Sequence, residues 1–552
     1  MPSRANTVPV PVPAAAEHRK VIAGSSLGAM FEWYDFFLYG ALAPVLAGVF
    51  FKGLDDRLAL VAALLTFAAG FVVRPFGALV FGRLGDLIGR KYTFLVTLLL
   101  MGAATFAIGL LPGYETLGVA APVALVVLRL LQGLAIGGEY GGVVTYVAEH
   151  APRGRRGFYT GWIQATASLG LLLALLVITG LRSVLGDEAF THWGWRVPFL
   201  LSIVLLAIGV WVRLSLQESP LFRQLKQSGR ASRKPLTEAF GQWPNLRLVL
   251  IALFGLVAGQ AVVWYTGHFQ ALFFLTLQLK VDATTASLMM CAALALATPL
   301  FVVFGALSDR IGRKPIILTG CLLAALAYLP LFQALTAAAN PALAAAQQHV
   351  STTLSADPAA CGWNIDPTGT LQRSTGCDLA KRWLSDRAVS YSVNYSVGAG
   401  SGPAVVSVGS ERIDIAPDDA SARGRLNAAL DAAGYPARAD PAQVDHVRVV
   451  GILLLLLVFV TMVYGPIGAL LVEMFSTRVR CSSVSLPYHV GNGWFGGLLP
   501  SAAFAIALHT GNMYNGLWYP IAIALVSCAI GLVFVKETKD VDLDSAGHQD
   551  TR

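Results

Sequence analysis

Charged residues are scarce in this chain: of its 552 residues only 13% are Asp, Glu, Lys or Arg, whereas 55% are hydrophobic. Soluble domains carry about 25% charged residues, so this chain lacks the polar surface that water requires. The shortage excludes a disordered chain, a nucleic-acid-binding protein and an ordinary cytosolic enzyme. We therefore expect most of the chain to lie in lipid. We interpret the formal net charge of +8 as a signal of membrane topology.

Long apolar runs are what the chain has instead. Each run is about the 20 residues that a helix needs to cross a bilayer, so we expect an all-α polytopic membrane protein with twelve transmembrane helices. No signal-peptide cleavage pattern precedes the first run, and we expect that run to be retained. The runs lie near residues 21–49, 58–82, 92–111, 119–148, 157–181, 196–216, 248–277, 285–307, 316–338, 448–472, 482–508 and 515–535.

Lys and Arg are far more numerous in the connections on one side of these runs than in the short connections on the other side. Basic residues gather on the cytoplasmic side of a membrane. Both termini are therefore expected in the cytoplasm, and the protein in a bacterial-type cytoplasmic (inner) membrane.

A charged turn occurs twice. Residues 82–91 read GRLGDLIGRK after the second run, and residues 305–314 read GALSDRIGRK after the eighth. Glu149 and Glu473, each followed by several Arg, form a second pair, and they lie about 100 residues farther apart than the two turns. The chain therefore reads as two pseudo-symmetric six-helix halves with an added segment, the pattern of a transporter with its site between the halves. The expected divisions are a cytoplasmic N-tail at 1–20, an N-terminal six-helix bundle at 21–217, a cytoplasmic linker at 218–246, a C-terminal bundle at 247–535 and a cytoplasmic C-tail at 536–552.

The added segment is the polar stretch 339–447, expected outside the membrane as a small α+β subdomain between helices 9 and 10. Residues 389–397 alternate as in a half-buried strand, and 423–433 reads as a helix. Cys361 and Cys377 lie in this stretch and would form a disulfide in an oxidising compartment; two unpaired thiols are the alternative. No metal-ligand spacing or catalytic motif is present there.

The repeated turns predict a gate. Their Gly residues let helix ends turn sharply, and a carboxylate is favoured near a helix N-terminus. Arg90 would reach Glu149, and Arg313 would reach Glu473, at a cytoplasmic interface that opens and closes. A simple topological anchor is the alternative. The residues expected in the gate are Asp86, Arg90, Glu149, Asp309, Arg313 and Glu473.

These turns resemble the signature of the major facilitator superfamily, and further motifs resemble its metabolite:proton symporter family. The motifs are 31–40 (FEWYDFFLYG), 74–77 (RPFG), 129–133 (RLLQG), 137–142 (GGEYGG) and 193–199 (WGWRVPF). The resemblance covers all twelve runs and implies proton-driven uptake of a small organic acid, such as a di- or tricarboxylate, 2-oxoglutarate or a shikimate-like metabolite, or of a zwitterion such as proline or betaine. The chain departs from the family at Ser476, where a Pro is usual, and in the added segment.

Ionisable residues inside the runs are costly in lipid and indicate function. Glu32 and Asp35 lie three residues apart on one helix face, and two close carboxylates favour binding a proton. Glu139 is a further candidate on the proton path. Arg129 suits bidentate binding of a carboxylate; it would hold the substrate or pair with Asp35, a structural ion pair being the alternative. Arg74 is interpreted as structural.

Several polar and aromatic residues are expected to line the substrate pocket with Arg129. They are Tyr34, Gln132, Gln164, Trp264, Tyr265, Gln270, Tyr464 and Asn492.

Three other functions are alternatives to uptake of an organic acid. An exporting antiporter is disfavoured because the fifth run has no proline, and an osmosensing zwitterion carrier because the C-tail is too short for a coiled coil. A membrane-anchored receptor or enzyme would act through 339–447, which shows no catalytic arrangement. We expect no enzyme activity, no cofactor, no metal and no nucleic-acid partner; the partners are protons, lipid and a small metabolite, and the protein is expected to act as a monomer.

Overall fold

The computed structural model is mostly helical, and the predicted fold class, a polytopic helical membrane bundle, is confirmed. Most of the predicted C-tail, parts of the N-tail and linker, and the side chain of Arg90 lie outside what the structure describes. The described residues are 15–53, 56–214, 218, 223, 226–227, 232–358, 361, 375–395 and 403–543.

We call the helices from α1 to α10 the first group. Its opening span is broken, because α1 and α2 meet at an angle of 62°. Pro44 stands in the first turn of α2, where its missing N–H cannot continue the ladder of α1. The elements of this group are α1 (Ala15–Ala41), α2 (Ala43–Phe50), α3 (Asp56–Val72), α4 (Arg74–Leu87), α5 (Arg90–Leu110), α6 (Tyr114–Leu117), α7 (Ala120–His150), α8 (Arg156–Leu185), α9 (Asp187–Ala189), η1 (Phe190–Gly194) and α10 (Arg196–Leu214).

The second group runs from α13 to α25 and follows α12 (Pro235–Phe240). Its first span contains three π-helical turns, η2, η3 and η4, each of which widens the helix by one residue. Its elements are α13 (Trp243–Ala252), η2 (Leu253–Val257), α14 (Ala258–Tyr265), η3 (Thr266–Gln270), α15 (Ala271–Phe273), η4 (Phe274–Gln278), α16 (Ala283–Ile311), α17 (Arg313–Ala339), α21 (His446–Tyr464), α22 (Ile467–Met474), α23 (Arg480–Val490), η7 (Gly491–Gly496), α24 (Leu499–Thr510), η8 (Asn515–Leu517) and α25 (Trp518–Phe534).

Ten helices of the described chain are long and apolar enough to cross a membrane, and α1 with α2 makes an eleventh if the bent pair is one span. The predicted run at 482–508 is formed by α23, η7 and α24, which do not make one continuous apolar helix. The break falls at Gly497 and Leu498, directly before Pro500 in the first turn of α24, and the polar side chains of α23 make this segment less apolar than the others.

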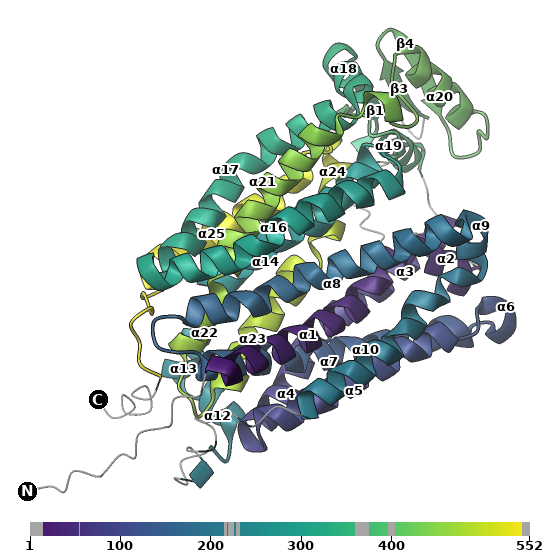
Figure 1. Ribbon diagram of the computed structural model, residues 1–552. Helices are drawn as coiled ribbons and strands as arrows, with labels where there is room; N and C mark the ends of the chain where they lie inside the picture. The colour runs from purple at the N-terminus through teal and green to yellow at the C-terminus, as the bar shows by residue number, and fades with distance from the viewer. Residues whose placement is uncertain are drawn as a thin grey trace, which may run out of the picture.

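The two groups lie side by side, with α8 of the first packed along α16 of the second (Figure 1). They also meet where α23 packs against α4 and α7. The start of α1 and the residues that follow α25 lie at one end of the bundle, here called the terminal end, and the strands lie at the other (Figure 1).

The segment between α17 and α21 forms a four-stranded sheet of order β2-β1-β3-β4, in which only β1 and β2 are parallel. A disulfide joins Cys361 to Cys377. The segment is fixed to the second group, because Tyr391 donates its backbone N–H to Gly511 O (2.8 Å) and its hydroxyl to Leu508 O (2.9 Å). Its elements are α18 (Pro341–His349), β1 (Thr352–Ala356), α19 (Gly376–Asp386), β2 (Ser392–Tyr395), β3 (Ala404–Val408), β4 (Glu411–Ile415), α20 (Ala422–Ala432) and η6 (Pro441–Gln443).

Candidate functional site

The first repeated turn joins the two groups through Asp86, at the end of α4. Its carboxylate accepts hydrogen bonds from the backbone N–H groups of Cys481 (3.2 Å) and Ser482 (2.9 Å) and from the Ser482 hydroxyl (2.8 Å). These N–H groups belong to the first turn of α23, where a helix has no internal acceptors for them. A carboxylate of the first group therefore caps a helix of the second group, at the favourable end of its dipole.

The second repeated turn makes the reciprocal contact. Asp309, near the end of α16, accepts hydrogen bonds from the backbone N–H groups of Gly157 (2.8 Å) and Phe158 (2.9 Å) in the first turn of α8. Arg313 pairs with Asp309 at 2.9 Å. Each group thus caps one helix of the other at the terminal end.

Two buried ion pairs flank these caps. Glu473 meets Arg313 at 3.1 Å and Arg156 at 3.4 Å, so the structure brings together the predicted pair of Arg313 and Glu473. Glu149 meets Arg480 at 2.9 Å, again from one group to the other. The gate predicted from the sequence does not include Arg156 and Arg480. Each follows one of the two repeated Glu residues, and that repeat was the signal that could have identified them.

A buried triad lies within the first group. Arg213, near the end of α10, places Nη2 3.0 Å from Glu32 Oε1 and 2.9 Å from Glu139 Oε1. Glu32 therefore shares its partner with Glu139, and the expected proximity of Glu32 to Asp35 stays a prediction. Residues three apart on a helix point about 60° away from each other, which is enough to direct the two side chains to different neighbours. Arg213 was missed because it stands at the end of an apolar run and reads as a loop residue.

Arg129 does not pair with Asp35 among the described contacts, so that expectation is also corrected. Its Nη1 donates to Phe36 O (3.1 Å) and to Gln132 Oε1 (3.0 Å), and Gln132 in turn donates to Thr105 Oγ1 (2.7 Å). Asp35 is buried, and its Oδ1 has no hydrogen-bond partner in the structure. Arg129 is therefore held inside the first group by neighbours from that group.

Aromatic side chains fill the interface between the groups. Phe37 stacks on Trp264 (ring centroids 5.6 Å apart), and Phe71 meets Tyr265 edge-on (5.6 Å). Nearer the terminal end, Tyr140 stacks on Tyr488 at 3.3 Å. Of the residues predicted to line a pocket, Trp264 and Tyr265 therefore reach across the interface.

The other predicted pocket residues are placed as follows. Tyr464 and Tyr488 share a hydrogen bond between their hydroxyls. Gln164 donates to the Tyr140 hydroxyl (2.8 Å). By contrast, Tyr34 donates to Pro198 O (2.9 Å) inside the first group, Asn492 exchanges hydrogen bonds with Gln260 (3.2 and 3.3 Å) inside the second, and Gln270 is partly exposed at the end of η3.

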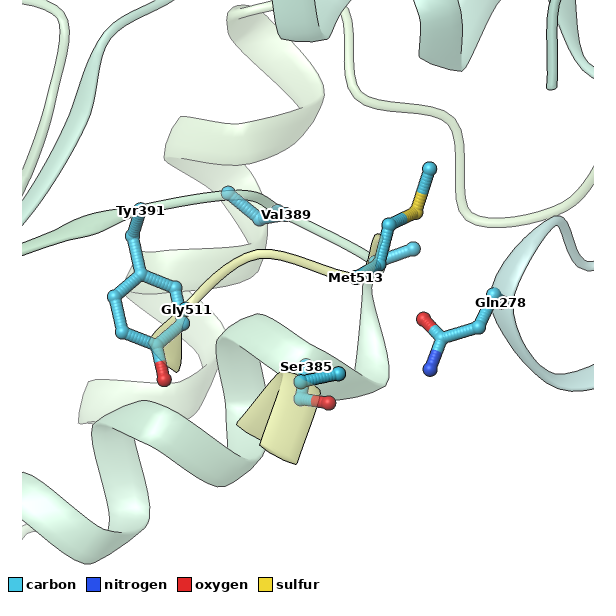
Figure 2. Close-up of a pocket in the computed structure, with 8 residues that line it drawn as sticks. Gln278, Ser385, Val389, Tyr391, Gly511 and Met513 are labelled. Atoms are coloured by element: carbon cyan, nitrogen blue, oxygen red, sulfur yellow. The ribbon is translucent and has the colours of Figure 1, made fainter. Parts of the chain in front are cut away.

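Among the described residues, two small cavities each have a volume of about 10 Å³, room for about one water molecule. One lies where the strand-bearing segment meets the second group, with Tyr391, Gln278 and Met513 around it (Figure 2). The other lies beside Glu139 and is lined by Trp33 and Tyr140. Neither could hold a metabolite, because ligand pockets measure roughly 300–1,000 Å³.

Comparison with known proteins matches two family models. "Sugar (and other) transporter" matches residues 21–241, and "MFS/sugar transport protein" matches residues 152–359.

Three relatives from Escherichia coli strain K12 show the range of similar proteins. The proline/betaine transporter is 35% identical over 57% of this chain and 64% of its own length. The shikimate transporter is 35% identical over 58% of this chain and 73% of its own length. The alpha-ketoglutarate permease is 38% identical over 58% of this chain and 72% of its own length. The match to the proline/betaine transporter thus spans less than two thirds of that relative.

Solved structures share the fold at low identity. The proton:xylose symporter XylE bound to 6-bromo-6-deoxy-D-glucose is 15% identical, with a TM-score of 0.62 over 97% of this chain and 99% of that chain. A partially occluded inward-open form of XylE from E. coli is 16% identical, with a TM-score of 0.58 over 95% of this chain and 99% of that chain.

Proposed function

Because the chain belongs to the major facilitator superfamily, we propose that this multi-pass membrane protein is a secondary active transporter that takes up a small organic acid together with protons. Relatives named for shikimate and alpha-ketoglutarate support the cargo class. The terminal end faces the cytoplasm of a bacterial inner membrane, the strand-bearing segment faces outward, and the protein acts as a monomer. The two helical groups correspond to the N- and C-terminal bundles divided in the sequence.

The observation that carries this proposal is the reciprocal capping at the terminal end. Asp86 caps α23 and Asp309 caps α8, so both caps are made or lost together when the groups tilt apart. Two packed arrangements of the same interface are what alternating access requires. The buried pairs at Glu149 and Glu473 close the same gate.

Proton coupling is assigned to Glu32, Glu139 and Asp35. One guanidinium nitrogen of Arg213 serves both Glu32 and Glu139, and a single positive charge balances only one carboxylate. The transported proton binds the carboxylate that Arg213 leaves uncompensated, and the cavity beside Glu139 offers room for a water molecule on its path. Asp35, buried without an ion pair in the described chain, is a second proton site.

Uptake into proteoliposomes tests the proposal. The purified protein is reconstituted, and the probes are labelled 2-oxoglutarate, shikimate, citrate, proline and glycine betaine, each with and without an imposed pH gradient. We expect accumulation of at least one of the three acids to depend on the gradient. Absence of gradient-driven accumulation for all five probes would contradict the proposed function.

The Glu139→Gln variant isolates the coupling step. It should lose gradient-driven accumulation but keep exchange of labelled for unlabelled substrate, because exchange needs no net proton movement. The exposed Glu188 on α9 provides the matched control, and Glu188→Gln should behave as the parent protein. Loss of exchange together with accumulation would contradict the assignment of Glu139 to coupling.

Uptake of a zwitterion is the second candidate. Identity with the proline/betaine transporter is 35%, the same as with the shikimate transporter. Gradient-driven accumulation of proline or glycine betaine alone in the same assay would select it.

A further inference from the structure

Arg74, the first residue of α4, is buried without a hydrogen bond. Its side chain is fully inaccessible to water, and Nε, Nη1 and Nη2 all lack a hydrogen-bond partner. The guanidinium instead lies over three aromatic rings, 5.2 Å from that of Trp33, 4.4 Å from that of Phe36 and 4.9 Å from that of Phe71. Cation–π contacts do not satisfy its five N–H donors, and a buried charge without an anionic partner is strongly unfavourable.

The carboxylates of the described chain do not pair with Arg74. Glu32 and Glu139 are held by Arg213, and Glu149 is held by Arg480. Asp86 is occupied by the first turn of α23. Asp35 is buried but makes no ion pair with Arg74, so Arg74 has no anionic partner among the described residues.

The second group also contributes an unpartnered polar side chain near this interface. His489 on α23 is fully buried, and neither ring nitrogen has a hydrogen-bond partner. Gly493, one helical turn after His489, lies against the start of α4, because a Cβ built on it would be 3.9 Å from Arg74 Cβ. Arg74 therefore lies where the two groups meet. Arg129 donates to Phe36 and Gln132 within the first group.

Arg74 and His489 both stand beside local irregularities in helices that otherwise continue. Val73 forms a turn between α3 and α4, with Pro75 in the first turn of α4, and α23 continues into the π-helical η7 after Val490. A Cβ built on Gly493 of η7 would lie 3.9 Å from Arg74 Cβ, so the two irregularities face each other. Transporters of this architecture bind their cargo between the two halves.

We propose that Arg74 and His489 bind the carboxylate of the cargo between the two groups, with the Tyr265 hydroxyl beside them, and that the cargo carries a net negative charge. This inference rests on the proposed transport function and names its substrate subsite. Arg74 donates from the first group and His489 from the second, so one carboxylate links the groups. The guanidinium of Arg129, 3.9 Å from the centre of the same Phe36 ring, adds a second positive charge, which disfavours a zwitterion.

Binding to the purified full-length protein in nanodiscs tests the subsite separately from transport. The probes are 2-oxoglutarate, shikimate and glycine betaine, titrated by calorimetry. We expect Arg74→Gln to weaken acid binding roughly 10- to 100-fold, the effect of losing a charge-assisted hydrogen bond. Arg74→Lys keeps the charge but not the bidentate geometry, and should weaken it by a smaller factor. His489→Gln should also weaken binding.

Arg182→Gln is the matched control. Arg182 also stacks on one aromatic ring, that of Phe190 at 5.0 Å, but lies at the far end of α8. The control should bind the acids as the parent protein does. Unchanged acid affinity in Arg74→Gln, or Arg74-dependent binding of glycine betaine but not of the acids, would overturn the inference.

Two readouts distinguish failure of the subsite from failure of the proposed function. Arg74→Gln should lose substrate exchange as well as gradient-driven uptake, whereas Glu139→Gln keeps exchange. Normal exchange by Arg74→Gln overturns the subsite and leaves transport standing. If Arg74→Gln does not fold, Arg74→Lys and His489→Gln, checked by their melting temperatures, carry the same test.

Discussion

Asp86 accepts two hydrogen bonds from Ser482, one from its backbone N–H at 2.9 Å and one from its hydroxyl at 2.8 Å, although the two residues lie 396 positions apart. The contact closes the terminal end of the bundle through a helix cap. A cap of this kind stabilises a helix by roughly 0.5–2 kcal/mol, a range in which one substitution changes the populations of two states without unfolding the protein.

Asp86→Asn should therefore open the terminal end more often. Asn keeps one acceptor but loses the charge that the helix dipole favours, so the open population should rise about 2- to 10-fold, the effect of roughly 0.5–1.4 kcal/mol. Cys481 is buried directly beneath this cap and serves as a native reporter. Its alkylation by N-ethylmaleimide, followed by mass spectrometry, should accelerate by that factor.

The exposed Asp187 on α9 supplies the control for this measurement. Asp187→Asn should leave the alkylation rate of Cys481 unchanged. An equal rate in the parent protein and in Asp86→Asn would show that the cap does not hold the gate.

Arg213→Gln should be strongly destabilising, because it leaves Glu32 and Glu139 buried without a positive partner. Breaking a buried ion pair costs roughly 3–5 kcal/mol, which should appear as a clear drop in the melting temperature of the protein in detergent. Adding Glu32→Gln and Glu139→Gln to Arg213→Gln should recover much of that loss, since no unpaired charge remains.

The comparison of these variants forms a thermodynamic cycle. The exposed Arg83 is the control, and Arg83→Gln should not change the melting temperature. Additive effects of the three substitutions would contradict the triad.

Gly137 brings α7 into contact with α4. A Cβ at Gly137 would lie 2.2 Å from the carbonyl oxygen of Arg74, which is backbone and cannot move aside. Gly137→Ala should therefore push the two helices apart, destabilise the protein by roughly 1–3 kcal/mol and displace Arg74, so that binding of 2-oxoglutarate weakens as well. Thermal unfolding and calorimetry measure the two effects.

Gly48 is the matched glycine, because a Cβ there meets nothing within 4 Å. Gly48→Ala should preserve both stability and binding. If Gly137→Ala has the melting temperature of the parent protein, the close approach of α4 and α7 is not required.

Reduction of the disulfide should loosen the strand-bearing segment alone. Cys361 and Cys377 are 16 positions apart, and closing a loop of that length contributes about 3 kcal/mol. Limited proteolysis should cut residues 339–447 faster in the Cys361→Ser, Cys377→Ser double variant, while the helical groups stay intact. Equal cleavage rates with and without the disulfide would contradict this assignment.

Hydropathy and motif spacing were sufficient to predict much of the fold from the sequence. Residues in lipid must be apolar and a helix must span a fixed thickness, so ten spans pass as continuous apolar helices, and an eleventh if the bent pair is counted. The repeat likewise pointed to Asp86 and Asp309, because a turn with a fixed function keeps its residue types. The broken segment from α23 to α24 is less regular than expected, since its polar residues face the interior.

The same signals do not report rotation about a helix axis. Arg74 and Arg129 both look like isolated charges in apolar runs, yet Arg74 lies against Gly493 of the second group and Arg129 hydrogen-bonds within the first. Arg213 needs two partners from α1 and α7, which no local pattern in α10 reveals. The candidate site could be outlined from the sequence, but which charges meet depends on the packing of all the helices.

The reciprocal caps also set a requirement for water. The N–H groups of Gly157, Phe158, Cys481 and Ser482 lose their hydrogen-bond acceptors when the groups separate. Those acceptors, the carboxylates of Asp86 and Asp309, lose their donors at the same time. Each of these groups must then be hydrated, so opening the terminal end takes up water from the surroundings. The equilibrium between the open and the closed terminal end therefore depends on water activity. A solute that is excluded from the protein surface lowers water activity and favours the closed gate.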